Sequence, residues 1–301
     1  MLSWARRSFV LAICIASLVG LSPIRSQHLS RPTSQSLLHT TRSSRNDLAV
    51  GGELSGLPKG TVRYVRYQDL LALDQESYTV TDDPSIRVKT EISGVALTTL
   101  AKLFGQAAHS DMIVAICSDK YRSNYSREYM AAHHPILVLK VNGQLNDHWP
   151  PSEYKTWLGP YFISHPVFHP SEPVLSYKDE PHVPFEVTRL DFRTEEVVFG
   201  AIEPPGKWDV NSSVWKGYRI AREDCYRCHS SHGEGGQSAE RTWQTLAMFA
   251  AANPERFQRY VRKPTSVRKS AKMAPHEDFD DATLAALTAY FQTFTKSRTT
   301  P

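Results

Sequence analysis

The residues best suited to chemistry lie late in the chain, in the run Cys225-Tyr226-Arg227-Cys228-His229. Two thiols at this spacing can add to the two vinyl groups of one haem, and the imidazole that follows can ligate its iron. A four-ligand zinc site would need a second cysteine pair, which the sequence lacks. The pattern therefore predicts one covalently bound haem, attached through Cys225 and Cys228 and ligated by His229. A zinc-binding or purely structural role is the alternative.

The start of the chain resembles an export signal. Arg6 and Arg7 precede an apolar run over residues 9–21, and cleavage fits near Ser26. We therefore expect residues 1–26 to be a signal peptide and the mature protein to be periplasmic or otherwise extracytoplasmic. The alternative is an uncleaved anchor, which would keep the protein near a membrane, although the run is short for a spanning helix.

Cysteine usage and charge narrow the class of protein further. Of the four cysteines, Cys14 lies in the signal and only Cys117 lies outside both the signal and the Cys225–His229 run. No intramolecular disulfide is expected in the mature chain. The 301 residues are 41% hydrophobic and 22% charged, which favours two globular domains. The formal net charge of +4 gives no indication of nucleic-acid binding.

The middle of the chain predicts a mixed α and β domain. Residues 27–57 are rich in Ser, Thr and Arg without a sustained apolar period, so we expect a flexible tether there. Residues 58–200 carry alternating or compact apolar runs, which predict a domain of strands and short helices. The expected strands are 62–67, 111–117, 136–141, 185–192 and 196–199, with a helix starting at Leu97. Residues 201–214, which contain Pro-Pro-Gly, are the expected linker.

Three segments of this region carry a family resemblance: GVALTTLAKLFG, DMIVAICSDKYRSNYSREYMAAHHPILVLKVNGQ and LGPYFISHP. Residues of about 60–195 resemble the oxidoreductase molybdopterin-binding fold of sulfite oxidases, which implies an α+β domain. That family holds molybdenum with an upstream cysteine thiolate, but no cysteine lies between Cys14 and Cys117. We therefore expect a domain without molybdopterin, with Cys117 as an inert core thiol. His165 and His169 are expected to be surface or loop histidines, with pocket lining as the alternative.

Residues 215–297 resemble a small class I cytochrome c, which implies an all-α domain. The resemblance makes Met273, in Lys272-Met273-Ala274-Pro275, the second iron ligand. Met248, His232 and His276 are rivals for that position. His/Met ligation would raise the reduction potential relative to His/His ligation.

The resemblance also implies a close helix crossing, and the sequence lacks one motif of the family. In the family a glycine, here Gly217, lets the first and last helices cross closely, and Tyr290 would meet Gly217 and Tyr218. The Gly-Pro-x-Leu that often follows the haem loop is absent after Gly236. In the family its proline carbonyl orients the proximal imidazole, so another acceptor must orient His229.

Charge is unevenly distributed. The segment from Trp215 to the end holds 14 basic and 9 acidic side chains, so it is about +5. One basic cluster lies just before Met273 and comprises Arg256, Arg259, Arg262, Lys263, Arg268, Lys269 and Lys272. It predicts a face that attracts an acidic redox protein, with an ordinary solvated surface as the alternative.

Together these features predict an exported mono-haem cytochrome that carries single electrons between redox partners, with a cofactor-free docking domain in front. No catalytic residue is assigned, because a six-coordinate iron has no open position for a substrate. The alternatives are a dehydrogenase that contains haem and molybdopterin, and a haem-based redox or gas sensor.

Overall fold

The structure is a computed structural model that describes residues 37–81, 83, 85–86, 88–152, 156–166 and 182–295. The chain divides into two compact units, Met1–Pro32 and Thr33–Pro301, and every described residue belongs to the second. The predicted signal peptide lies outside the described residues. Within the described part of the chain, no helix is long and apolar enough to cross a membrane.

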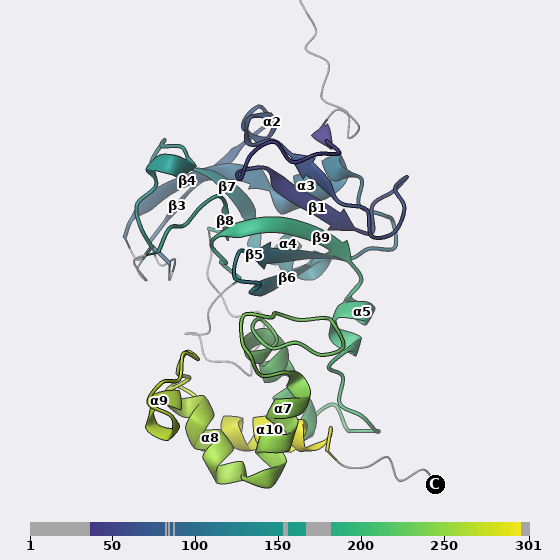
Figure 1. The fold of residues 1–301 in the computed structure, drawn as a ribbon, viewed down its shortest axis with the longest axis vertical. Helices are drawn as coiled ribbons and strands as arrows, with labels where there is room; N and C mark the ends of the chain where they lie inside the picture. The colour runs from purple at the N-terminus through teal and green to yellow at the C-terminus, as the bar shows by residue number, and fades with distance from the viewer. Residues whose placement is uncertain are drawn as a thin grey trace, which may run out of the picture. The chain divides into compact units, whose positions relative to one another are not determined.

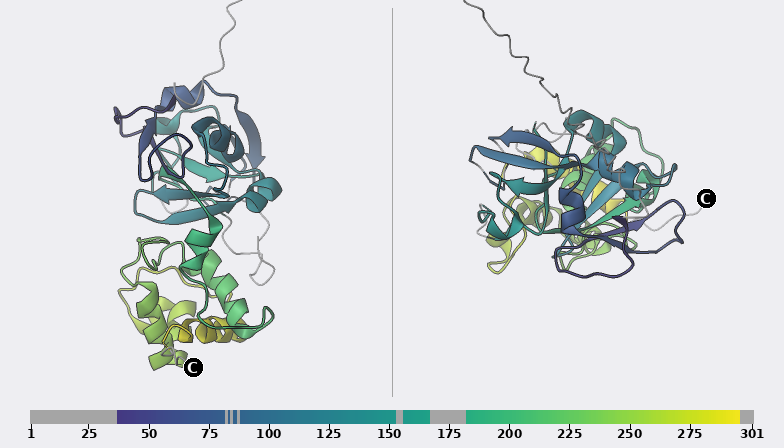
Figure 2. Two further views of the ribbon diagram at one scale, coloured as in Figure 1. Left: turned by 90° about the vertical axis from the view of Figure 1, so that its right-hand side faces the viewer. Right: turned by 90° about the horizontal axis from the view of Figure 1, so that it is seen from above.

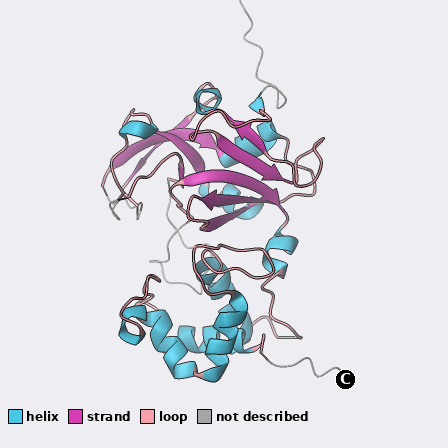
Figure 3. Cartoon of the chain, in the orientation of Figure 1, coloured by secondary structure: helices cyan, strands magenta, loops and turns pink. Residues whose placement is uncertain are grey.

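Strands and helices separate along the described sequence (Figures 1 and 3). All named strands lie between Leu48 and Arg193, whereas only helices and loops follow. The prediction of an α+β region followed by a helical region is confirmed at this level. The assignment of the helical region to the class I cytochrome fold stays a prediction.

The first sheet has the strand order β2-β1-β9-β5-β6. Strands β1 and β9 pair in parallel, and the other neighbours are antiparallel. The strands are β1 (Leu48–Gly52), β2 (Arg63–Val65), β5 (Met112–Cys117), β6 (Arg122–Ser126) and β9 (Val187–Arg193).

The second sheet is antiparallel throughout, with the order β3-β4-β7-β8. Its strands are β3 (Glu76–Val80), β4 (Thr90–Ala96), β7 (Ile136–Val141) and β8 (Phe162–Ser164). The helical elements of this region are α2 (Tyr67–Leu71), α3 (Leu97–Phe104), α4 (Arg127–His133), the short η1 (Asn146–His148) and α5 (Glu195–Gly200). Residues of both sheets and of α3 form one hydrophobic core.

Two sequence predictions in this region are wrong. The expected tether over residues 27–57 contains β1, which pairs with β2 on one side and β9 on the other. Leu48 and Val50 are fully buried, because their alternation places both on one face of the strand. The expected strand over residues 196–199 is part of helix α5, whose first turn is capped by the Thr194 hydroxyl accepting from the Val197 N–H at 3.3 Å.

Strand β5 is buried on both faces. Ile113, Ala115 and Cys117 belong to the core of the sheets, whereas Met112 and Val114 belong to the core of the C-terminal helices. A strand covered on both faces reads as a continuous apolar run, and residues 112–117 are such a run. The sheet therefore forms a wall of the helical core.

Helices and loops make up the described C-terminal region, coloured green to yellow in Figure 2. Its elements are α6 (Ser213–Ile220), the π-helical turn η2 (Ala221–Cys225), α7 (Trp243–Ala252), α8 (Pro254–Arg262), α9 (Pro264–Val267) and α10 (Asp281–Gln292). Asp280 caps α10 by accepting the Thr283 N–H at 2.7 Å. Pro254 and Pro264 open α8 and α9, where a missing N–H costs no hydrogen bond.

Helices α6 and α10 cross closely at Gly217. A Cβ atom on Gly217 would lie 2.1 Å from the Ala286 carbonyl oxygen and 2.6 Å from the Tyr290 Cβ. The Tyr218 and Tyr290 rings lie 6.0 Å apart between centroids. The predicted contact of Tyr290 with Gly217 and Tyr218 is confirmed, and only glycine fits at this crossing.

Candidate haem-binding site

The residues Cys225–His229, called the haem motif below, form a tight turn after η2. The N–H groups of Cys228 and His229 donate to the Cys225 carbonyl oxygen at 3.2 and 2.9 Å. Neither cysteine forms a disulfide, and Cys225 is buried whereas Cys228 is half-buried. The turn therefore holds the two thiols and the imidazole in one short, ordered segment without a disulfide.

The His229 imidazole is oriented by a backbone carbonyl. Its Nδ1 lies 2.6 Å from the Arg241 carbonyl oxygen, which can only accept, so Nδ1 carries the proton. Burial lowers the His229 pKa, partly opposed by this hydrogen bond. The ring is therefore neutral, and its Nε2 lone pair is available to a metal. The Arg241 carbonyl oxygen is therefore the acceptor that orients His229 in the absence of the Gly-Pro-x-Leu motif.

The environment of Cys225 disfavours thiol exchange. Burial raises the Cys225 pKa well above its usual value, whereas thiol exchange uses a thiolate. Among the described residues, no group of three or more His, Cys, Asp and Glu side chains is placed to hold a metal ion. The donor set of the motif, with two thiols and one neutral imidazole, matches covalent haem with a single protein nitrogen on the iron.

The loop after His229 folds back onto the motif. The Gly236 N–H donates to the Tyr226 carbonyl oxygen at 2.8 Å. A Cβ on Gly236 would lie 1.7 Å from the Arg227 carbonyl oxygen, and one on Gly235 would lie 2.4 Å from the Tyr226 ring. Both positions require glycine, because the loop and the motif are in direct contact there.

The candidates for the second iron ligand separate into two groups. Met248 is 53% exposed on α7, and His232 is exposed with its Nδ1 3.0 Å from the Ser231 hydroxyl. Met273 and His276 are half-buried in the segment between α9 and α10. Burial, with smaller electrostatic effects of the nearby Arg227 and His229, lowers the His276 pKa to about 4. His276 is therefore neutral and within electrostatic range of His229, which keeps it as the rival of Met273.

Strands β6 and β9 hold the loop that follows the haem motif through Glu234. Its carboxylate accepts from Arg122 Nη1 at 3.2 Å and from Arg193 Nη2. The side chains of the three residues are 15–23% exposed. We call this arrangement the Glu234 clamp. The Arg122 N–H also donates to the Arg227 carbonyl oxygen at 2.9 Å, so β6 contacts the motif directly.

Backbone carbonyls at the end of the front region accept hydroxyl groups from the helical region. The Tyr226 hydroxyl donates to the Val198 carbonyl oxygen at 2.7 Å, and the Ser231 hydroxyl donates to that of Ala201 at 2.7 Å. The Tyr290 hydroxyl donates to the carbonyl oxygen of Ile202, which is itself fully buried. The first residues of the predicted linker are thus packed against the helices.

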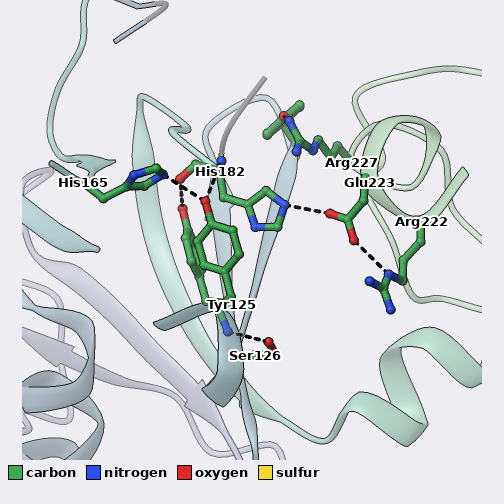
Figure 4. A network of polar contacts seen from close by, with 9 residues as sticks. Tyr125, Ser126, His165, His182, Arg222, Glu223 and Arg227 are labelled. Atoms are coloured by element: carbon green, nitrogen blue, oxygen red, sulfur yellow. Dashed lines mark hydrogen bonds and ion pairs between the residues drawn. The ribbon is translucent and has the colours of Figure 1, made fainter. Parts of the chain in front are cut away.

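A buried polar cluster lies beside the motif and was missed by sequence reasoning (Figure 4). The Tyr129 ring stacks on the His182 ring at 4.3 Å between centroids, and the Tyr129 hydroxyl lies 2.9 Å from His165 Nε2. His182 Nε2 lies 2.8 Å from Glu223 Oε2, and Arg222 Nε donates to Glu223 Oε1 at 2.8 Å. These residues come from α4, from the connection between β8 and β9, and from η2, so no spacing in the sequence could reveal them.

Ionisation in this cluster follows from its contacts. Burial opposes ionisation of Glu223, but the hydrogen bond from His182 and the charges of Arg222 and Arg227 are among the interactions that outweigh it and lower the Glu223 pKa to about 2. Burial lowers the His182 pKa, against the effect of Glu223. A neutral His182 therefore donates its Nε2 proton to an ionised Glu223. His165 lies in a loop, one of the two positions expected for it, but it is fully buried and not at the surface, and His169 lies outside the described residues.

Cys117 is a buried thiol at the end of β5. It is 6% exposed, and burial raises its pKa well above the usual value. Buried thiols of this kind are unreactive, which agrees with the expected core position. The absence of molybdopterin stays a prediction.

Comparisons with known proteins give little beyond this geometry. No protein-family model matches the sequence, and no curated protein matches it. Among solved structures, the chain is similar to the sulfane dehydrogenase SoxCD from Paracoccus pantotrophus, with 13% identity and a TM-score of 0.35. The match covers 52% of this chain and 40% of that one, so this chain spans less than half of the neighbour's length. Likeness at this level says nothing about activity.

Proposed function

We propose that the protein is an exported c-type cytochrome that carries single electrons through one covalently bound haem. The observation that carries the proposal is the haem motif itself, where two thiols that form no disulfide adjoin an imidazole whose Nδ1 donates to the Arg241 carbonyl oxygen. The bound haem would supply a one-electron iron couple. Cys225 and Cys228 would attach it, and His229 would ligate the iron through Nε2.

The front region would support the haem motif. The Glu234 clamp and the Arg122 N–H fix the motif from two strands of a buried sheet. An electron carrier gains from such support, because a rigid ligand environment limits rearrangement between the two oxidation states. We therefore propose a supporting role for this region in addition to the docking role expected from the sequence.

Met273 is the proposed second iron ligand, and His276 is its rival. Alanine variants of both residues distinguish the two. A Met273→Ala variant should lose the weak sulfur-to-iron absorption band of the ferric protein and bind carbon monoxide readily when reduced. His276→Ala should keep the band and resist carbon monoxide. If His276→Ala opens the iron and Met273→Ala does not, His276 is the ligand.

The partner would be a redox protein with an acidic docking face. Arg256, Arg259, Lys269 and Lys272 are exposed and form no ion pair in the described part of the chain. Two other members of the basic cluster are paired, Arg262 with Asp281 at 2.6 Å and Lys263 with Glu277 at 3.3 Å. Electron exchange with an acidic protein should slow as salt is raised, because exposed charges are screened. A rate independent of ionic strength would contradict this docking face.

A metal count with an absorption spectrum tests the proposal against its alternatives. We expect iron near one equivalent, no stoichiometric molybdenum, and a six-coordinate spectrum in both oxidation states. Molybdenum near one equivalent together with iron would support the dehydrogenase. Five-coordinate ferrous haem in the unmodified protein would support the sensor.

A further inference from the structure

We propose that the Arg241 guanidinium binds a haem propionate. This inference rests on the proposed function and assigns the residue that recognises the anionic edge of the cofactor. Arg241 would then serve the haem twice, with its backbone carbonyl on the proximal imidazole and its side chain on the propionate.

The first observation is an unsatisfied buried donor. Arg241 Nη1 is buried and has no hydrogen-bond partner among the described residues. A guanidinium stays charged at all accessible pH values, so this nitrogen cannot reduce its need for a partner by losing a proton. A buried charged donor without an acceptor is costly, which indicates that an anion completes the site.

The second observation is that the guanidinium is held in place. Its Cζ lies 4.6 Å from the centroid of the Tyr260 ring and 5.5 Å from that of Phe249. Stacking on aromatic faces orients the planar fork without satisfying its N–H groups. The side chain is therefore positioned in advance, with hydrogen-bonding capacity left for a ligand.

The third observation is the place where this side chain starts. The Arg241 carbonyl oxygen is 2.6 Å from His229 Nδ1, so Arg241 begins beside the imidazole that would bind the iron. The propionates are the anionic groups of a haem, and each carries its carboxylate on a short, flexible chain. A carboxylate is also the group that the arginine fork matches with two parallel hydrogen bonds.

The test compares Arg241→Gln and Arg241→Lys with Arg256→Gln, an equal charge change at an exposed position of α8. Both Arg241 variants keep the backbone carbonyl that orients His229. Covalent haem is first verified by the pyridine haemochrome spectrum. The readouts are then the midpoint potential at low and high salt and the propionate bending mode in the resonance Raman spectrum.

Arg241→Gln should lower the midpoint potential, because the uncompensated carboxylate favours ferric iron. The expected shift is a tenfold change in the ratio of oxidised to reduced protein, about 59 mV for a one-electron couple, and it should persist at high salt. Its propionate mode should move to lower frequency. Arg241→Lys should shift the potential less, because it keeps the positive charge. If Arg241→Gln accumulates poorly, the propionate mode is measured in Arg241→Lys instead. Arg256→Gln should give a small shift that salt removes.

A potential shift no larger than that of Arg256→Gln, or an unchanged propionate mode, would overturn the assignment of Arg241 and leave the proposed function intact. Absence of covalent haem from the unmodified protein would overturn both.

Discussion

Replacing Glu234 with Gln tests whether the front region supports the haem motif. The substitution keeps the size of the side chain but removes the charge that pairs with both Arg122 and Arg193. The new amide also turns its NH₂ group toward one of the two arginines. Both groups can only donate hydrogen bonds, so they cannot pair. One change therefore leaves two partly buried cations without a counter-charge.

The magnitude follows from burial. Removing one partner of a buried ion pair costs about 3–5 kcal/mol, because the remaining charge is uncompensated. The Arg122 and Arg193 side chains are 16% and 23% exposed, so water can recover part of this loss. We expect Glu234→Gln to reduce the free energy of unfolding by about 2–3 kcal/mol, at or below the lower end of that range.

The assay is urea unfolding of the full chain, followed by haem absorbance and by tryptophan fluorescence. The matched control is Glu277→Gln, which breaks the ion pair with Lys263, where both side chains are about 60% exposed. Such surface pairs are worth about 0–1 kcal/mol, so the control midpoint should barely move. If Glu234→Gln unfolds at the same urea concentration as Glu277→Gln, the clamp does not support the motif and the reasoning fails.

Two further predictions concern the helix crossing and the buried polar cluster. Gly217→Ala should lower the melting temperature, because overpacking at the crossing costs about 1–3 kcal/mol. The control Gly200→Ala should leave the melting temperature unchanged, because a Cβ at Gly200 meets nothing within 4 Å. Equal melting temperatures for the two variants would contradict the close crossing of α6 and α10. The Glu223 pKa is about 2 in the folded chain against an ordinary value of 4.5, so its ionisation stabilises the fold above about pH 4.5 by up to about 3 kcal/mol. That contribution is lost as the pH falls from about 4.5 to 2, and urea midpoints of Glu223→Gln should show a shallower loss over this range; parallel curves for the two proteins would refute the pKa.

Local sequence patterns predicted four of the nine named strands, β2, β5, β7 and β9. Strands β5 and β7 follow from compact apolar runs. Strand β1 was missed, because the short run Leu48–Gly52 follows a polar stretch and its pairing depends on β9, far along the chain. Local propensity cannot reveal such a pairing.

Only part of the candidate site could be predicted from local sequence patterns. The motif identifies Cys225, Cys228 and His229, because their chemistry depends on adjacent positions. The Glu234 clamp and the His182–Glu223 contact join residues 41 or more positions apart, so only the fold reveals them. The missing Gly-Pro-x-Leu predicted that another acceptor must exist, but its identity as Arg241 depends on where the loop returns.

The most direct test of the account is the intact mass of the purified protein under denaturing conditions. The full chain, including its N-terminal segment, should be produced in a host that exports it and attaches haem to other c-type cytochromes. We expect the polypeptide mass to be increased by one haem, and Cys225→Ala/Cys228→Ala to have the mass of the polypeptide alone. An unmodified protein whose denatured mass equals that of the polypeptide would contradict the central claim.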